Sequence, residues 1–303
     1  MRRIKIGTRS SRLALWQAQF AASELKKFFP KLEIELVKVK TTGDKILDAP
    51  LAKIGGKGLF TKELELQMEK GAIDLAVHSL KDVPTELPEG FRIAAITKRA
   101  QPFDAFVSNK FSSFDALPKN SVVGTSSLRR AAQILSLRPD LQIKNLRGNV
   151  ETRLKKLDAG NFDAIILAAA GLERLCYSSR IGEILTEIIP AAGQGALAIE
   201  TRADDEEIFS LVQKLNDTET FAAVEVEREF LKEVGGSCQI PVGVFARIDG
   251  DKIKIHALIA SPDGKKIVRN FEVAPLENIR GLGKKIAAHL LNSGGREILK
   301  NIF

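Results

Sequence analysis

The chain has 303 residues, of which 44% are hydrophobic and 28% are charged, so we expect a globular protein with two or three domains. The longest strongly apolar stretch, 164–172, is far shorter than the ~18 residues that cross a bilayer, and residues 1–7 are too polar for a signal peptide. The net charge of +8 attracts anions, but with 6% aromatic residues and no basic run of five, a stacking surface for single-stranded nucleic acid is poorly supplied.

The first 190 residues contain one arrangement of elements twice. A strand over 3–6, a turn over 7–11 and a helix over 13–28 recur as a strand over 122–123, a turn over 124–127 and a helix over 128–137, displaced by 117 residues (124 − 7). In each half, a helical pattern between two glycines then leads into an aspartate and an apolar strand, with Asp74 and Asp163 at matching positions. Strands that alternate with helices indicate doubly wound parallel sheets, so we predict two α/β lobes that enclose a cleft.

The domain boundaries follow from this repeat. We expect the first lobe to comprise 1–98 and 193–216, because a strand over 196–200 and a helix over 204–215 read as a return to it, and the second lobe to comprise 99–192. The two crossing segments could act as a hinge. The linker 39–58 is rich in Lys, Thr and Gly, and we expect a loop near the cleft, a candidate lid.

Residues 217–303 read as a small α+β domain. Asp217 is a plausible N-cap for a long helix over 218–234. Turn signals at 249–250 and 263–264 then separate three antiparallel strands, and a helix over 276–291 closes the domain.

Both turns of the repeat place backbone N–H groups and hydroxyls at a helix N-terminus, where they can hold an anion. Arg9 lies in the first turn, Arg129 and Arg130 follow the second, and Arg147 precedes another helix start, with Arg153 six residues on. Arginine binds carboxylates in a planar two-bond fork. For any one turn, plain N-capping beside surface arginines is the commoner explanation; two matching turns favour a ligand with several carboxylates. The chain has no Walker-type loop and no Gly-x-Gly-x-x-Gly fingerprint.

The segment 78–84 follows the apolar strand 72–77 of the first lobe, at the end of the sheet where ligands of α/β proteins bind. When Asp74 is aligned with Asp163, the residues opposite His78, Lys81 and Asp82 are Leu167, Ala170 and Gly171. The second lobe thus has packing residues where the first has an ammonium group and a carboxylate. We expect Asp82 to act as an acid/base or to stabilise a cation, and Lys81 to contact an anion; a solvated turn is the alternative.

Metal chemistry is not favoured, because His78, His256 and His289 are far apart and no Cys-x-x-Cys occurs. The two cysteines do not make a disulfide framework, so we expect a cytoplasmic protein. We expect Cys176 to be a packed small hydrophobe. Cys238 lies in a glycine-flanked loop and lacks recognisable His and Asn partners, so if it is more than an unremarkable thiol, a covalent attachment point is the interpretation that remains.

With these residues in place, the chain resembles the porphobilinogen deaminase (hydroxymethylbilane synthase) family of tetrapyrrole biosynthesis. The matching stretches occur in order over most of the chain, at 7–11 with 13–17, 51–60, 76–84, 104–108, 123–130, 146–150 with 152–153, 193–195 and 235–239. The resemblance implies two lobes like those of periplasmic binding proteins, a third domain, and a dipyrromethane cofactor joined to Cys238 by a thioether. It also implies a transferase that adds four porphobilinogens in turn, each with loss of ammonia, before water releases hydroxymethylbilane.

The resemblance further assigns residues by position. Asp82 corresponds to the catalytic carboxylate. The groups implied for the cofactor, besides Asp82 and Cys238, are Lys81, Thr125, Ser126, Ser127, Arg129, Arg130 and Arg147. Those implied for the substrate are Arg9, Ser11, Gln17, Arg147, Arg153, Arg174 and Gln194. The chain departs from the family pattern at Arg12, where a proline is expected, and Cys176 is not part of the pattern.

Two other functions would explain some of these features. A non-catalytic small-anion binding protein with two lobes explains the arginines, but it explains neither Asp82 nor Cys238. A nucleic-acid binder is suggested by the net charge alone. We therefore expect a small-molecule partner, porphobilinogen, with no nucleic acid, no membrane and no metal, and a monomer, because no exposed apolar stripe is evident.

Overall fold

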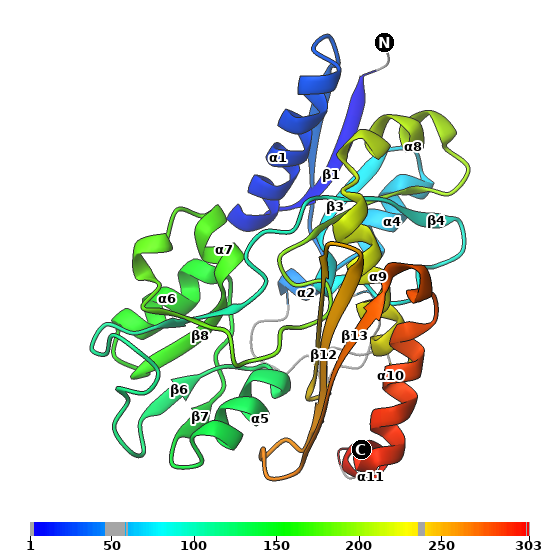
Figure 1. Cartoon of the computed structure of the whole chain (residues 1–303). Coiled ribbons are helices and arrows are strands. Elements are labelled where there is room, and N and C mark those ends of the chain that lie inside the picture. Colours follow the sequence, from blue (N-terminus) through cyan, green and yellow to red (C-terminus); the bar gives the residue numbers. More distant parts are fainter. Residues whose placement is uncertain (1–2, 46–57, 59, 236–239, 301, 303) are drawn as a thin grey trace.

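A computed structural model of the chain describes residues 3–45, 58, 60–235, 240–300 and 302. They form two five-stranded sheets and one three-stranded sheet. In Figure 1 the first sheet lies at the top, the second at the lower left in green, and the third at the lower right in orange. No helix in the described ranges is long and apolar enough to cross a membrane.

The first lobe is built on the sheet with the strand order β2-β1-β3-β10-β4, whose bounds are β1 (Ile4–Arg9), β2 (Ile34–Val39), β3 (Leu75–Ser79), β4 (Phe91–Ile96) and β10 (Leu197–Arg202). Strands β2, β1 and β3 are parallel, and β10 is antiparallel to both of its neighbours. Apolar side chains of α1 (Arg12–Phe28) and α8 (Glu206–Val212) cover one face, and those of α4 (Lys62–Glu69) cover the other. Strand β10 thus lies in this sheet, as expected of a segment that returns to the first lobe.

The second lobe repeats this plan with the order β7-β6-β8-β5-β9, whose bounds are β5 (Asp104–Val107), β6 (Val122–Gly124), β7 (Gln142–Lys144), β8 (Ala164–Ala168) and β9 (Glu183–Leu185). Strands β7, β6 and β8 are parallel, and β5 is antiparallel to β8 and β9. Helix α5 (Leu128–Leu137) packs on one face, while α6 (Val150–Asp158) and α7 (Ala169–Arg174) pack on the other.

The predicted repeat is confirmed by its two aspartates. Asp74 Oδ2 accepts the N–H of Lys5 at 2.8 Å, and the N–H of Asp74 donates to the carbonyl of Lys5. Asp163 makes the same pair of bonds with Val122, with its Oδ2 at 2.9 Å from the N–H. In both lobes the aspartate therefore fixes the start of the strand that follows it against the neighbouring parallel strand.

Two strands extend further than the sequence predicts. Strand β1 continues through Gly7 to Arg9, and β3 continues through His78 to Ser79. Gly7 is required for close packing rather than for a turn, because a Cβ there would lie 2.3 Å from Ile73 Cδ1. The equivalent Gly124 also lies in a strand, and its Cβ would lie 2.8 Å from the ring of Phe162.

The third domain contains the predicted antiparallel sheet of β11 (Val242–Asp249), β12 (Lys252–Ala260) and β13 (Ile267–Pro275), with α9 (Thr218–Glu233), α10 (Leu282–Leu290) and α11 (Arg296–Lys300). Asp217 caps α9 by accepting the N–H of Thr220, as predicted. Helix α10 begins later than expected, because Leu276–Asn278 forms a 3₁₀ turn and Gly281 has a left-handed φ of 74°. Of the candidate lid at 39–58, residues 39–45, which include α2 (Thr42–Lys45), and Gly58 are described, and 46–57 lie outside the described residues.

Candidate active site

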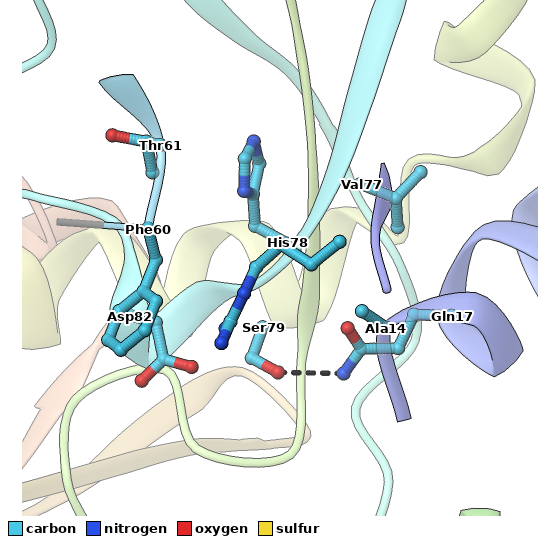
Figure 2. Close-up of a pocket in the computed structure, with 9 residues that line it drawn as sticks. Ala14, Gln17, Phe60, Thr61, Val77, His78, Ser79 and Asp82 are labelled. Atoms are coloured by element: carbon cyan, nitrogen blue, oxygen red, sulfur yellow. Dashed lines mark hydrogen bonds between the residues drawn. The ribbon is translucent and has the colours of Figure 1, made fainter. Parts of the chain in front are cut away.

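The carboxyl end of β3 carries the predicted catalytic turn. A single 3₁₀ turn, η1 (Leu80–Asp82), follows the strand, and Asp82 is exposed at its end. Asp82 lines a cavity of about 30 Å³ together with Arg9, Gln17, Phe60 and Ser79. In Figure 2 the amide of Gln17 donates to the Ser79 hydroxyl, at a distance of 2.7 Å. The site predicted around Asp82 and the first helix is therefore brought together.

His78 precedes this turn but points into the protein interior. Its ring points away from the Asp82 carboxylate (Figure 2), and its Nε2 lies 2.9 Å from Glu200 Oε2 on β10. Both side chains are buried. Glu65 of α4 lies close enough for its charge to interact with both: burial raises the pKa of Glu65, a hydrogen bond with Thr61 lowers it, and Glu200 raises it. His78 thus lines the same cavity as Asp82 and belongs to a buried polar cluster with Glu200 and Glu65.

Lys81 connects the turn to the second lobe. Its Nζ donates to Gln194 Oε1 at 3.3 Å, and Gln194 Nε2 donates to Asp104 Oδ1 at 2.9 Å and to the carbonyl of Pro102 at 2.7 Å. Burial lowers the pKa of Lys81 to about 8, an effect that Asp82 opposes and Arg130 strengthens. The polar atoms of the buried Gln194 side chain all make hydrogen bonds within the protein. Since these bonds go to Lys81 in the first lobe and to Asp104 in the second, Gln194 connects the lobes.

Asp104, which the sequence motifs contain but to which we assigned no role, is the centre of a buried ion-pair network. Arg129 donates to its Oδ2 at 2.8 Å, and Arg130 donates to its Oδ1 at 2.7 Å. Burial alone would raise the pKa of Asp104, but the two guanidinium groups lower it well below its usual range. Arg129 also donates to the carbonyl of Ile189 at 2.7 Å, so it supports the site from within the second lobe.

Two further arginines of the second lobe face this network. Arg153 of α6 donates through Nε to the carbonyl of Gly148 at 2.7 Å, and burial together with the charges of Arg130 and Arg147 lowers its pKa to about 10. Asp82 is among its electrostatic neighbours. The Nε atoms of Arg130 and Arg147 are buried and have no hydrogen-bond partner among the described residues.

We call these groups the cleft cluster. It has five cations and two carboxylates, a formal charge of +3 (5 − 2), from Lys81, Arg129, Arg130, Arg147, Arg153, Asp82 and Asp104. Arg129, Arg130 and Asp104 are buried, whereas Lys81, Arg147 and Arg153 are half-buried. An excess of positive charge in such surroundings is costly unless an anion compensates it. The cluster therefore fits a ligand with several carboxylates, which could use the two unpaired Nε donors.

The hydroxyl groups of the two turns act mainly in capping. Ser11 Oγ accepts the N–H of Ala14 at 3.3 Å at the start of α1, and Ser127 Oγ accepts the N–H of Arg130 at 3.4 Å at the start of α5. Thr125 Oγ1 accepts the N–H of Ser127 at 3.2 Å, and Ser126 donates to the carbonyl of Leu146 at 2.5 Å. These bonds shape the two turns and cap the N-terminal ends of α1 and α5.

Arg174 and Arg12 lie where the two lobes meet. Arg174 donates to the carbonyl of Gly195 at 2.6 Å and lies 5.4 Å above the ring of Trp16, and burial lowers its pKa to about 10. Arg12 is the first residue of α1, and its Nη1 lies 3.3 Å from Glu151 Oε1 of α6. Since Ser11 still caps α1, Arg12 does not disrupt the first turn; it adds a contact between the lobes.

The structure tests the prediction for one cysteine and not for the other. Cys238 lies outside the described residues, between the end of α9 and the start of β11. The prediction that Cys176 is packed in the interior is wrong, because its side chain is exposed. It follows α7 with a left-handed φ of 61°, and the N–H of Tyr177 bonds back to the carbonyl of Leu172, which is a Schellman-type helix end.

Comparison with known proteins identifies the family. Residues 4–210 match the model described as "Porphobilinogen deaminase, dipyromethane cofactor binding domain", and residues 221–292 match the model described as "Porphobilinogen deaminase, C-terminal domain". A curated porphobilinogen deaminase of Geotalea uraniireducens is 50% identical over 305 residues, which cover 100% of this chain and 96% of that protein. The chain belongs to the porphobilinogen deaminase family.

Solved structures of other proteins align with part of the chain. The methionine-binding protein MetQ aligns with a TM-score of 0.47 and 16% identity, over 72% of this chain and 92% of MetQ. A periplasmic substrate-binding protein of a Coxiella burnetii ABC transporter aligns with a TM-score of 0.46 and 12% identity, over 72% and 94% of the two chains. In this member of the porphobilinogen deaminase family, the topology of the sheets themselves shows two lobes of one plan and a third, antiparallel sheet.

Proposed function

We propose that this chain is a hydroxymethylbilane synthase that joins four porphobilinogens head to tail, with loss of ammonia at each addition, and then releases hydroxymethylbilane by hydrolysis. The family supports the reaction and the dipyrromethane cofactor. The observation that supports the site is the cleft cluster, whose formal charge of +3 includes the exposed carboxylate of Asp82. A two-lobed protein that only binds small anions has no need of that carboxylate in a cationic site.

The residues present fit the cofactor. Dipyrromethane has acetate and propionate arms, and the unpaired Nε atoms of Arg130 and Arg147 are suited to carboxylates. We propose that these arms are held by Lys81, Arg130, Arg147, Thr125, Ser126 and Ser127, and that Cys238 is the thioether attachment point. The bound cofactor supplies the pyrrole carbon to which the first porphobilinogen is joined. Arg129 positions this group of residues through Asp104.

We propose that porphobilinogen is bound by residues of both lobes. Arg9 is the last residue of β1, Ser11 caps α1 and Gln17 lies in α1. Arg9 and Gln17 line the cavity that Asp82 lines. Arg153 and Arg174 approach from the second lobe and would bind the carboxylates of porphobilinogen, while Gln194 holds Lys81.

Asp82 performs the proton chemistry in this proposal. Its carboxyl group gives a proton to the leaving amine, which departs as ammonia, and the carboxylate that results stabilises the cationic pyrrole. The charges of Lys81 and Arg153 lie close enough to interact with that of Asp82.

The organisation of the chain is part of the proposal. We propose domain boundaries at 1–98 with 193–216, 99–192 and 217–303, and the gap between the two family models at 211–220 supports the last of them. We also propose a monomer that acts in the cytoplasm on a small molecule, without a nucleic-acid partner.

The test is stoichiometric. Purified protein incubated with porphobilinogen should release one ammonia for each porphobilinogen consumed and one linear tetrapyrrole for every four. Binding of porphobilinogen without ammonia release would favour the anion-binding protein instead.

A further inference from the structure

Arg228 of α9 contacts the backbone directly after the catalytic turn. Its Nη1 donates to the carbonyl of Val83 at 3.3 Å, and its Nη2 donates to the carbonyls of Pro84 at 2.7 Å and Thr85 at 3.2 Å. One guanidinium from the third domain thus binds three consecutive carbonyls of the first lobe. In the described part of the chain its hydrogen bonds all go to these carbonyls.

The segment that Arg228 holds has little other support from regular structure. The 3₁₀ turn ends with the bond from the N–H of Val83 to the carbonyl of Leu80, and Pro84 has no N–H to donate. Arg228 therefore binds carbonyls that no sheet ladder occupies. Its side chain is largely enclosed there, and burial lowers its pKa while Glu225 raises it.

Apolar packing from the same face of α9 reinforces this contact. Val224 is buried against Leu80 and Val83, and Phe221 packs on the same cluster. Residues 221, 224 and 228 recur at helical spacing, so they lie along one face of α9. The next residue back from Arg228, Glu227, binds Arg99 at 2.6 Å and accepts the N–H of Gly193 at 2.7 Å. Helix α9 is thus fixed both to the catalytic turn and to the two segments that cross between the lobes.

Asp82 depends on this arrangement for its position. Its side chain is exposed, and no hydrogen bond joins it to another described residue, so the backbone of residues 80–85 determines where the carboxylate lies. We propose that Arg228 is a positioning residue that holds the catalytic turn against α9 and so sets the position of the Asp82 carboxylate. This inference rests on the proposed function.

Two variants of the cofactor-loaded enzyme test it. Arg228→Met removes the five N–H donors and keeps an unbranched side chain, and Arg228→Lys keeps the charge but not the fork. The matched control is Arg202→Met, because Arg202 also donates to two carbonyls of the first lobe, those of Met68 at 2.8 Å and Ile73 at 3.0 Å, at the end of β10 remote from Asp82.

The readouts are kcat and KM for porphobilinogen, the intact mass and the urea midpoint. For Arg228→Met we expect normal covalent loading, a kcat reduced about tenfold and a KM within about twofold, because small misplacement of a catalytic group affects the chemical step. Added guanidinium at low millimolar concentration should restore part of kcat. Arg228→Lys should fall between Met and wild type, and Arg202→Met should lower the urea midpoint with kcat within about twofold.

A wild-type kcat in Arg228→Met, or an equal loss of kcat in Arg202→Met, would overturn the proposal. If Arg228→Met does not fold, Arg228→Lys decides: a reduced kcat at a near-normal urea midpoint supports positioning, and a normal kcat contradicts it. Failure of the proposed function itself is distinguishable, because then the wild-type protein would release no ammonia from porphobilinogen.

Discussion

Asp104 Oδ1 lies 2.7 Å from Arg130 Nη2, and both side chains are almost fully buried. The same carboxylate binds Arg129 and accepts the amide of Gln194 at 2.9 Å. Gln194 in turn accepts the ammonium of Lys81 at 3.3 Å, so one carboxylate in the second lobe is connected to the residue beside Asp82 in the first. The lobes are thus joined at the site by charged hydrogen bonds.

Asp104→Asn should strongly destabilise the protein. The substitution leaves two buried guanidinium groups without a negative partner, which costs about 3 kcal/mol of unfolding free energy or more. Urea denaturation measures the change. Asp140→Asn is the control, because Asp140 binds Arg138 at 2.7 Å but is partly exposed to solvent, and it should cause a much smaller loss. Equal losses of unfolding free energy in the two variants would contradict the claim that burial makes the Asp104 ion pairs costly to break.

Asp82→Asn should fold normally and turn over slowly. The exposed carboxylate makes no contact on which folding depends, whereas general acid–base groups contribute about 10²-fold or more to turnover. Ammonia release at saturating porphobilinogen measures the change, and intact mass shows whether the variant carries cofactor. Turnover within twofold of the wild type, in a loaded protein, would remove Asp82 from its proposed role.

Glu65→Gln should change how stability depends on pH. Because burial raises the folded-state pKa of Glu65 above 4.5, the folded protein binds more protons than the unfolded chain from about pH 4.5 up to that raised value. The free energy of unfolding of the wild type, minus that of Glu65→Gln, should therefore fall as pH rises through this window and stay constant above it. Urea denaturation at several pH values measures the difference. Glu69→Gln, which removes an exposed carboxyl from the same helix, is the control. A constant difference between wild type and Glu65→Gln would be inconsistent with a proton held at Glu65.

Arg12→Pro, which introduces the residue expected from the family pattern, should be tolerated. Arg12 is the first residue of α1, where proline is well accommodated, and its ion pair with Glu151 is largely exposed on the arginine side. We expect a change in unfolding free energy of less than about 1 kcal/mol and a KM for porphobilinogen within about twofold. Arg3→Ala removes a similarly exposed pair, Arg3 with Glu35, within the first lobe and serves as the reference. A much larger effect of Arg12→Pro would mean that the contact between the lobes matters for binding.

The sequence predicts the architecture well because the signals are local. The two aspartates, the paired serine caps and the apolar strands each act within a few residues, and they recur in both lobes. Strand ends are less predictable. His78 reads as the start of a polar turn, but it stays in β3 because Glu200, 122 residues later, pairs with it in the core.

The sequence predicts a functional residue where the residue type by itself implies a chemical role. Lys81 and Asp82 stand out because the second lobe has alanine and glycine at the matching positions. The roles of Arg129 and Gln194 do not follow from the sequence, since their partners, Asp104 and the carbonyls of Ile189 and Pro102, come from other elements. Likewise, the exposure of Cys176 depends on a left-handed helix end that its neighbours in sequence do not reveal.

The most direct test of the account is the intact mass of the purified protein and of Cys238→Ala, with peptide mapping of any adduct. The account predicts that the wild type exceeds its sequence mass by two porphobilinogen units less the ammonia they lose, that the adduct maps to the peptide containing Cys238, and that Cys238→Ala has the bare mass and remains folded. A wild type with the bare mass after expression in cells that make porphobilinogen, or an adduct retained by Cys238→Ala, would contradict it.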